Sequence, residues 1–300
     1  MNIKRQPSVF LIGAAKSGTT SLYHYFKLHP QLFLPKLKEP MFFATPECNG
    51  ETGTIRDLDE YQKLYADCPQ GSLAFDCSTL YLNVHASAER IHTFNPEARI
   101  LVMLRHPVDR AFSAYSHLIR DGKETLEFKE ALAAEPTRQD HHTRLMRYRE
   151  LGHYTASLYE YERVFGKARM KVCLFDDFVR DPAVFMRDLY HFLGLEPVIP
   201  ASFTPYNYSG KVRHPFLYSL LAKPFLLKTI AKHLLPEIFR ENLKSRMLVH
   251  LTDKFSLPLR EASILSDYYQ PEIAKLESWL GRDLSEWKVR HAAPTSGFST

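Results

Sequence analysis

The sequence predicts a three-layer α/β fold, with a mostly parallel sheet of about five strands and helices on both of its faces. Short apolar runs typical of buried parallel strands recur at residues 9–12, 31–35, 72–76, 99–104 and 170–175. Segments with apolar residues at helical spacing lie between and after these runs. The chain has 300 residues, of which 45% are hydrophobic, so it can bury one substantial core. We therefore expect one domain, with an α/β core over residues 1–210 and a helical part over residues 211–300.

The helices are predicted from apolar spacing and from the residues that begin or end a helix. Asp181 followed by proline begins one helix, and Gly194 ends it. Gly281 stops the last long helix. The other expected helices follow residue 19, span residues 86–94, follow residue 106, and lie within residues 122–134, 144–165, 216–251 and 258–280.

The composition argues against several classes of protein. There are 39 Lys and Arg against 34 Asp and Glu, a net charge of +5, and the basic residues are spread along the chain. Nucleic-acid binding is therefore not expected, although this mild basicity suits an anionic cofactor or acceptor. The polar start at residues 1–7 has no signal peptide, and no apolar run is long enough to cross a bilayer. We expect a cytoplasmic location.

The cysteines point in the same direction. Cys48, Cys68, Cys77 and Cys173 have neither the paired spacing of metal sites nor the density of a disulfide framework. We expect reduced thiols, and a fold that needs neither a disulfide nor a metal ion.

A small-residue turn joins the first strand to the first helix and is suited to an anion. Lys16, Ser17, Gly18, Thr19 and Thr20 place an ammonium, three hydroxyls and backbone N–H groups at a helix start. The alternative is an ordinary turn with incidental hydroxyls. A nucleoside triphosphate P-loop needs its lysine directly after the second glycine, where this chain has threonine. A magnesium-dependent phosphotransferase also needs an aspartate at a strand end, whereas the best later strand is followed by arginine.

A second cationic turn follows the predicted fourth strand. Arg105 lies at the strand end and Ser113 lies two turns into the next helix, so the two could hold one phosphate from two sides. Arg110 is interpreted as an internal salt-bridge partner. His106 and His117 are interpreted as a loop residue and a helix-face residue rather than as catalytic bases.

Both turns resemble the cofactor motifs of sulfotransferases that use 3′-phosphoadenosine 5′-phosphosulfate (PAPS). Residues 15–20, Ala-Lys-Ser-Gly-Thr-Thr, resemble the loop for the 5′-phosphosulfate, and residues 104–115 resemble the 3′-phosphate element. The likeness is greatest to heparan-type and bacterial carbohydrate sulfotransferases, and it extends from about Val9 to Trp287. It implies a P-loop-like fold, PAPS as co-substrate, no metal, and sulfuryl transfer to a hydroxyl or amine. The acceptor it favours is a saccharide or glycolipid.

The resemblance also implies roles for the cofactor residues. Lys16 would stabilise the departing phosphate, while the rest of its turn holds the 5′-phosphosulfate. Arg105 and Ser113 would hold the 3′-phosphate. A late basic loop that resembles the family's cofactor-closing loop contains Gly210, Lys211 and Arg213.

Glu39 is the catalytic base that the resemblance implies, because it lies in a Lys-Glu-Pro-x-Phe-Phe segment. A later segment departs from the family pattern. Asp76 replaces a glutamate, Cys77 replaces a lysine of the heparan-type enzymes, and Thr79 replaces a proline. The change at Cys77 leaves the acceptor open. Asp76 is the rival base, and His153, near the expected acceptor cleft, is the next candidate.

Three alternatives remain. The first is a sulfotransferase that acts on a lipid or small molecule, since loops form the acceptor pocket. The second is a P-loop phosphotransferase, which the misplaced lysine disfavours. The third is a non-catalytic protein that binds a membrane or polyanion through the basic helices predicted at residues 216–251. Those helices would also permit peripheral membrane contact by an enzyme, and their other interpretation is a lid packed on the sheet.

Overall fold

A parallel sheet of five strands forms the centre of the protein. The computed structural model describes residues 6–48, 54–138, 143–200, 202–203, 211–212, 252–253 and 256–292. Its main sheet has the order β2-β3-β1-β4-β5, and every neighbouring pair is parallel. The strands are β1 (Val9–Gly13), β2 (Leu32–Phe33), β3 (Leu73–Asp76), β4 (Arg99–Leu104) and β5 (Met170–Leu174). The predicted α/β fold is confirmed.

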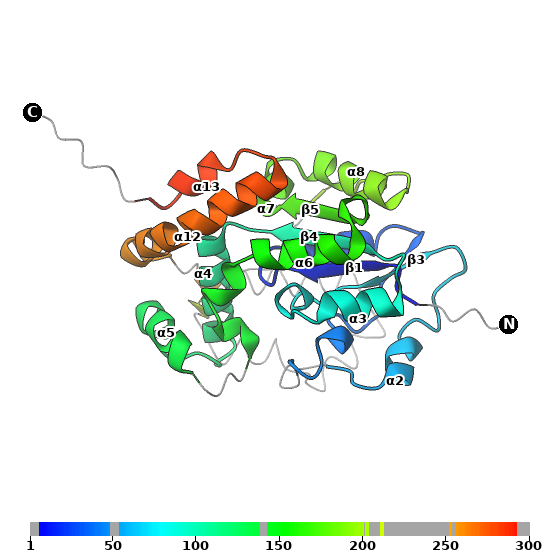
Figure 1. Ribbon diagram of the computed structural model, residues 1–300, viewed down its shortest axis with the longest axis horizontal. Coiled ribbons are helices and arrows are strands. Elements are labelled where there is room, and N and C mark those ends of the chain that lie inside the picture. The colour runs from blue at the N-terminus through cyan, green and yellow to red at the C-terminus, as the bar shows by residue number, and fades with distance from the viewer. Residues whose placement is uncertain are drawn as a thin grey trace, which may run out of the picture.

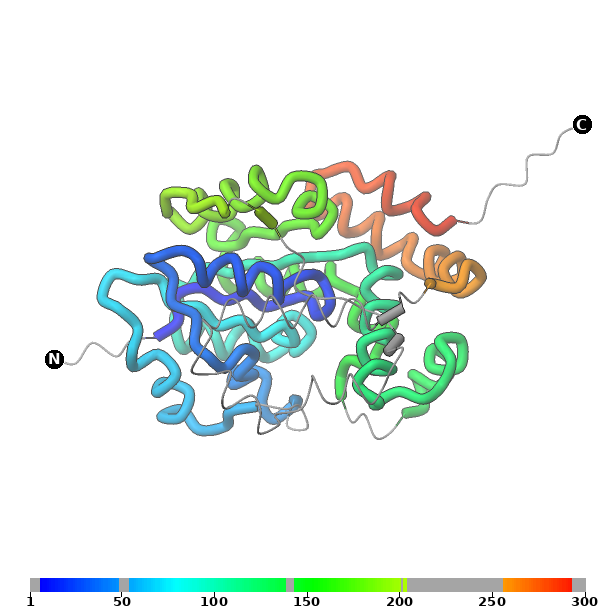
Figure 2. Tube along the Cα trace, turned by 180° about the vertical axis from the view of Figure 1, so that it is seen from behind, coloured from blue at the N-terminus to red at the C-terminus, as the bar shows by residue number. Residues whose placement is uncertain are grey.

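Helices cover both faces of this sheet. They are α1 (Thr19–Phe26), α2 (Leu58–Lys63), α3 (Ser87–Phe94), α4 (Pro107–Arg120), α5 (Phe128–Ala134), α6 (Thr155–Phe165), α7 (Phe175–Arg180), α8 (Pro182–Leu193), α12 (Leu259–Leu280) and α13 (Ser285–Val289). Phe10 and Ile12 of β1 share a core with α3, α4, α6 and α12, on the face turned to the viewer in Figure 1. Val9 and Leu11 pack with α1 and α8, and α1 lies in front of β1 in Figure 2. Alternate residues of one strand thus belong to opposite cores.

The turns after β1 and β4 lie beside each other because the two strands are neighbours. The chain places β2 and β3 on one side of β1, then crosses to place β4 and β5 on the other. Val9 pairs with Arg99 and Leu11 with Leu101, so the carboxyl ends of both strands reach the same edge. Open α/β sheets bind ligands where the strand order reverses in this way. The two predicted cationic turns meet at that point.

Two predicted helices are shorter than expected. Within residues 122–134 only α5 is helical, because Gly122 turns the chain at φ 69° and a capping box then begins α5. Within residues 144–165 only α6 is α-helical, and short 3₁₀ turns precede it. Gly152, in one of those turns, packs so closely that a Cβ would lie 2.4 Å from the Tyr269 hydroxyl. The contact with Tyr269 therefore determines the backbone conformation at Gly152.

Other predicted helix ends are confirmed. The Asp181 carboxylate accepts two backbone N–H groups at the start of α8, and Gly194 (φ 71°) ends it. Gly281 (φ 61°) ends α12. The helices predicted at residues 216–251 lie outside the described residues. Among the described helices, none has the length and apolar character needed to cross a bilayer.

Candidate active site

The turn between β1 and α1 gathers the donors predicted to hold an anion. Lys16 has a left-handed backbone (φ 71°), as does Gly18 (φ 89°), which caps α1. Ser17 is fully buried, and its Oγ has no hydrogen-bond partner in the described part of the chain. Burial lowers the pKa of the Lys16 ammonium to about 7, with the charge of Arg120 as the next cause. An incoming anion would stabilise both the desolvated amine and the unsatisfied hydroxyl.

Gly18 is required both by its conformation and by its surroundings. A Cβ there would be strained at φ 89° and would lie 2.7 Å from the Phe175 ring. We expect Gly18→Ala to lower the free energy of unfolding by about 1–3 kcal/mol in urea titrations. Gly71→Ala is the matched control, because Gly71 also has positive φ (83°) but open space around it. Equal losses in the two variants would contradict a role for Phe175.

The turn between β4 and α4 places a second cation beside the first turn. Arg105 Nη1 donates to the Lys16 carbonyl at 3.3 Å, and its Cζ lies 5.0 Å from the centre of the Phe175 ring. Burial lowers the pKa of Arg105 from its usual value, yet a guanidinium keeps its charge in proteins. Ser113, on α4, is 7% exposed. Arg105 therefore connects the two turns to the first residue of α7.

A cavity of about 260 Å³ lies between these turns. Its polar residues include Lys16, Arg105 and Ser113. Its apolar residues are Tyr25, Phe175, Phe178, Val179, Pro182 and Phe203. Cationic donors and aromatic rings in one cavity suit a phosphorylated ligand that also carries a planar ring system. We call this cavity the aromatic cavity.

A second cavity, of about 360 Å³, shares Lys16 and Gly18 with the aromatic cavity. Its other residues are Ala15, Thr19, Thr20, Lys38, Glu39, Met41, Thr79, Leu80, His117, Leu118, Lys123, Thr143 and Leu145. We call it the Glu39 cavity. Because Lys16 lines both, groups held in the two cavities can meet at this residue.

Glu39 lies in the same cavity as Lys16, on a strained loop. Its backbone is left-handed (φ 64°), which is uncommon for a glutamate. Its Oε2 accepts a hydrogen bond from Thr79 Oγ1 at 3.1 Å, and its Oε1 pairs with the Lys38 ammonium. The loop is anchored where Met41 N donates to Ser78 Oγ at 3.1 Å. These contacts hold the carboxylate toward the cavity.

Asp76, the rival base, is fully buried and lines neither cavity. Its carboxylate accepts hydrogen bonds from Ser78 Oγ at 2.6 Å, Tyr61 OH at 2.8 Å and Tyr81 OH at 2.9 Å. Burial raises its pKa to about 6, despite these donors. Ser78 also anchors the loop that carries Glu39, so Asp76 stabilises that loop through its hydrogen bond with Ser78. The same burial leaves Asp76 unsuited to hold the magnesium of a P-loop phosphotransferase.

The histidines considered as bases have other partners. His117 lines the Glu39 cavity, but its Nδ1 accepts from the Arg120 guanidinium, so its proton is on Nε2. His153 contacts Tyr268 OH at 2.9 Å and lines neither cavity. The prediction for Arg110 needs correction, because this fully buried side chain donates to the Tyr148 carbonyl instead of forming an ion pair with a described residue.

The predicted late loop is only partly described. Lys211 is in the strand β6 (Lys211–Val212), which pairs with β7 (Thr252–Asp253) and lies beside α4. Gly210 and Arg213 lie outside the described residues. The structure also adds cavity residues that the sequence pattern did not indicate. They are Tyr25, Lys38, Lys123, Thr143, Phe175, Phe178 and Phe203. A usable signal existed for two of them. Phe175 is the last residue of the strand predicted at 170–175, and Lys38 directly precedes Glu39 in the Lys-Glu-Pro segment.

Comparison with known proteins identifies relatives with this fold. The model of a sulfotransferase family matches residues 81–199. A sulfotransferase of Alicyclobacillus acidocaldarius is 33% identical, with a TM-score of 0.72, over 94% of this chain and 99% of that chain.

Two curated relatives match smaller parts of longer proteins. Human bifunctional heparan sulfate N-deacetylase/N-sulfotransferase 3 is 25% identical over 94% of this chain and 31% of its own length. Membrane-associated sulfotransferase kil1 of Dictyostelium discoideum is 31% identical over 38% of this chain and 23% of its own. The alignments thus span less than a third of each relative. With the fold and the near full-length structural match, they show that this chain belongs to the sulfotransferase family.

Proposed function

We propose that the protein transfers a sulfuryl group from PAPS to a hydroxyl, or an amine, of a saccharide acceptor. The observation that carries this proposal is that two cavities of different chemistry share Lys16. The nucleotide would lie in the aromatic cavity and the acceptor in the Glu39 cavity. A saccharide is supported by the human relative, whose name gives heparan sulfate as its substrate.

The residues of the aromatic cavity fit PAPS in charge and in chemical character. Lys16 and the backbone N–H groups at the start of α1 suit the 5′-phosphosulfate. Ser17 lines neither cavity, but its buried hydroxyl lies in the same turn and has no partner among the described residues. Arg105 and Ser113 suit the 3′-phosphate, and the aromatic rings suit adenine. Lys211, whose strand lies beside α4, would close over the 3′-phosphate with Gly210 and Arg213.

The reaction needs positioning and charge compensation more than covalent chemistry by the protein. When bound, PAPS supplies a sulfuryl group whose S–O bond to phosphate breaks as the acceptor oxygen bonds to sulfur. Lys16 donates to the oxygen that takes up the electron pair of the broken bond. Glu39 accepts the proton of the acceptor hydroxyl, while Thr79 and Lys38 keep its carboxylate oriented.

Transfer of radiolabelled sulfate from PAPS tests the proposal. The acceptors would be an unsulfated glycosaminoglycan, a glycolipid, a phenol and an alkyl amine. We expect label in the saccharide, and none with a Glu39→Gln/Lys16→Met double variant. Label only in the phenol or the amine would keep the sulfuryl transfer and overturn the saccharide. No transfer to any acceptor, together with magnesium-dependent ATP turnover, would overturn the whole proposal.

Arg105 should distinguish nucleotides by their 3′-phosphate. We expect Arg105→Ala to weaken binding of adenosine 3′,5′-bisphosphate (PAP) by about 1.5–3 kcal/mol in calorimetry, the range for charge-assisted hydrogen bonds. Adenosine 5′-phosphosulfate, which lacks the 3′-phosphate, should bind almost equally well to the variant and the wild type. Arg187→Ala, on the exposed face of α8, is the control. Equal losses for both nucleotides would contradict the assignment of Arg105.

A further inference from the structure

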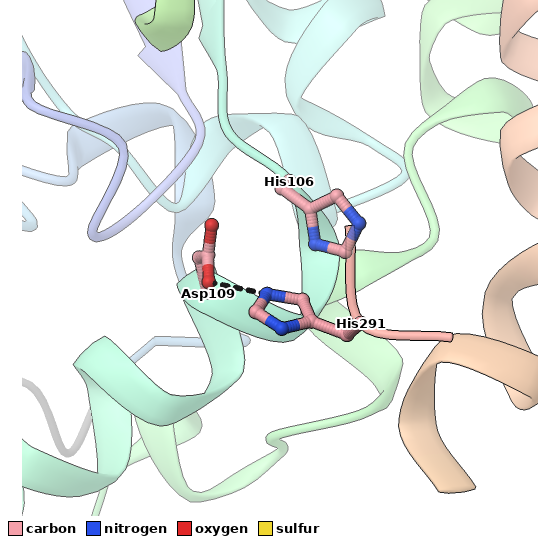
Figure 3. Close-up of side chains that lie close together, drawn as sticks. All are labelled: His106, Asp109 and His291. Carbon is pink, nitrogen blue, oxygen red and sulfur yellow. Dashed lines mark hydrogen bonds and ion pairs between the residues drawn. The ribbon is translucent and has the colours of Figure 1, made fainter. Parts of the chain in front are cut away.

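His106, Asp109 and His291 form a side-chain cluster that lines neither cavity (Figure 3). His106 precedes α4, Asp109 lies in the first turn of that helix, and His291 follows α13. One nitrogen or oxygen atom from each side chain lies within 4.8 Å of the other two. From the sequence we expect no metal. That expectation could not take this cluster into account, because only the fold brings His291 next to α4.

The protonation of His106 follows from its contacts. Its Nε2 lies 2.9 Å from the Trp287 carbonyl, and a carbonyl only accepts, so the proton is on Nε2. Nδ1 therefore carries a lone pair. The ring is 0% exposed, and Nδ1 has no hydrogen-bond partner among the residues that the structure describes. Buried nitrogen atoms are normally satisfied. A ring held from behind by a carbonyl, with its other nitrogen bare, is the usual state of a metal-binding histidine.

The other two side chains complete a donor set. His291 Nε2 lies 2.8 Å from Asp109 Oδ1, so a proton lies between these two atoms. A metal cation could take the place of that proton. Asp109 Oδ2 accepts from Arg290 Nη1 at 3.2 Å, which leaves Oδ1 turned to the cluster. Arg290 is also paired with Asp176 at 2.9 Å, so its charge is shared between two carboxylates. The side chains of Asp109 and His291 are 22% and 19% exposed, which gives an ion a path from solvent.

We propose that His106 Nδ1, Asp109 Oδ1 and His291 Nε2 bind a first-row divalent metal ion, Zn²⁺ in the first place. Two imidazoles and one carboxylate suit Zn²⁺, Co²⁺ or Ni²⁺ better than Mg²⁺ or Ca²⁺, which prefer oxygen ligands. Small side-chain rotations would bring the three atoms to about 2.0–2.2 Å from one ion, with water in the remaining position. The ion would fix the segment after α13 to the start of α4. The ion would take no part in sulfuryl transfer. The proposal of this metal site therefore does not rest on the proposed function.

Metal titration of the chelator-treated full chain tests this site without using activity. Calorimetry with Zn²⁺, and visible absorption with Co²⁺, would be carried out on wild type, His291→Ala and His191→Ala. We expect His291→Ala to lower Zn²⁺ affinity by at least about 10-fold. Mutation of a residue that only hydrogen-bonds to a metal ligand already lowers metal affinity by about 10–100-fold. His191, exposed at the end of α8, is the matched histidine control and should leave affinity unchanged.

Zn²⁺ should also raise the melting temperature of wild type but not of His291→Ala, because binding to the folded state alone stabilises it. Circular dichroism of His291→Ala in the absence of metal should match wild type. Asp109→Asn is the second variant and should also lose Zn²⁺ affinity. Equal Zn²⁺ affinity in wild type and His291→Ala would overturn the site. A sulfur-to-Co²⁺ charge-transfer band, which would place the ion on cysteine, would overturn it as well.

Discussion

Glu39→Gln is expected to lower turnover by about 10²–10⁴ at saturating acceptor while leaving PAP affinity almost unchanged. Glutamine keeps the size of the side chain and can still accept from Thr79 Oγ1, but it cannot take the acceptor proton. Because Glu39 lines only the cavity assigned to the acceptor, nucleotide binding should not depend on it. Initial rates of sulfate transfer and calorimetric PAP titrations measure the two quantities separately.

Two further variants decide whether Glu39 is the base. Glu60→Gln, on the exposed face of α2, is the control and should have wild-type turnover. Asp76→Asn should affect the stability of the fold more than turnover, since Asp76 accepts hydrogen bonds from three buried hydroxyls. If Glu39→Gln keeps more than about a tenth of wild-type turnover while folded Asp76→Asn is inactive, the two roles are reversed. If both remain active, neither carboxylate is the base.

The sequence was sufficient for the sheet and for the two anion-binding turns. Each strand is a short apolar run, and the two anion-binding turns directly follow strands, so their positions are local properties. Lys16 and Arg105 could therefore be named in advance, and the pairing of β1 with β4 brings them into contact. The short strand β2 and the residues around it were also placed correctly, although its observed length is only two residues.

The aromatic half of the site could not be predicted, because its rings come from elements far apart in the chain. Tyr25 lies in α1, Phe178 in α7, and Phe203 follows α8. In sequence, each is simply an apolar residue at helical spacing or next to a loop. Their convergence depends on how α1 and α7 pack on one face of the sheet, which spacing does not specify.

Asp76 is a residue whose surroundings the sequence could not indicate. A carboxylate at a strand end is a reasonable base until its surroundings are known. Tyr61, from α2, supplies one of the three hydroxyls that satisfy it, and nothing in the local sequence indicates that contact. Long-range packing thus gives Asp76 a structural role, through Ser78, in holding the Glu39 loop.

Lys16→Met is expected to lower turnover by about 10²–10³ and to remove the pH dependence of PAP affinity. The loss of turnover has the size expected for one donor to the developing charge of the leaving group. The pH effect follows from burial, which lowers the pKa of Lys16 to about 7 in the free protein. Bound phosphate favours the charged amine, so PAP binding takes up a proton above that pH. Wild-type affinity should therefore fall as the pH rises from about 7.5 to 9, up to tenfold per unit.

Calorimetry across this interval isolates Lys16, because phosphate monoesters, with a second pKa of about 6, are already ionised there. Methionine keeps the apolar stem without the charge, so Lys16→Met should bind PAP more weakly than wild type and with a flat pH profile. Lys63→Met, on the exposed face of α2, should retain the wild-type slope. A flat profile in wild type would mean that the amine stays charged in the free protein. A slope that persists in Lys16→Met would assign the proton to another group, and either result would contradict the prediction.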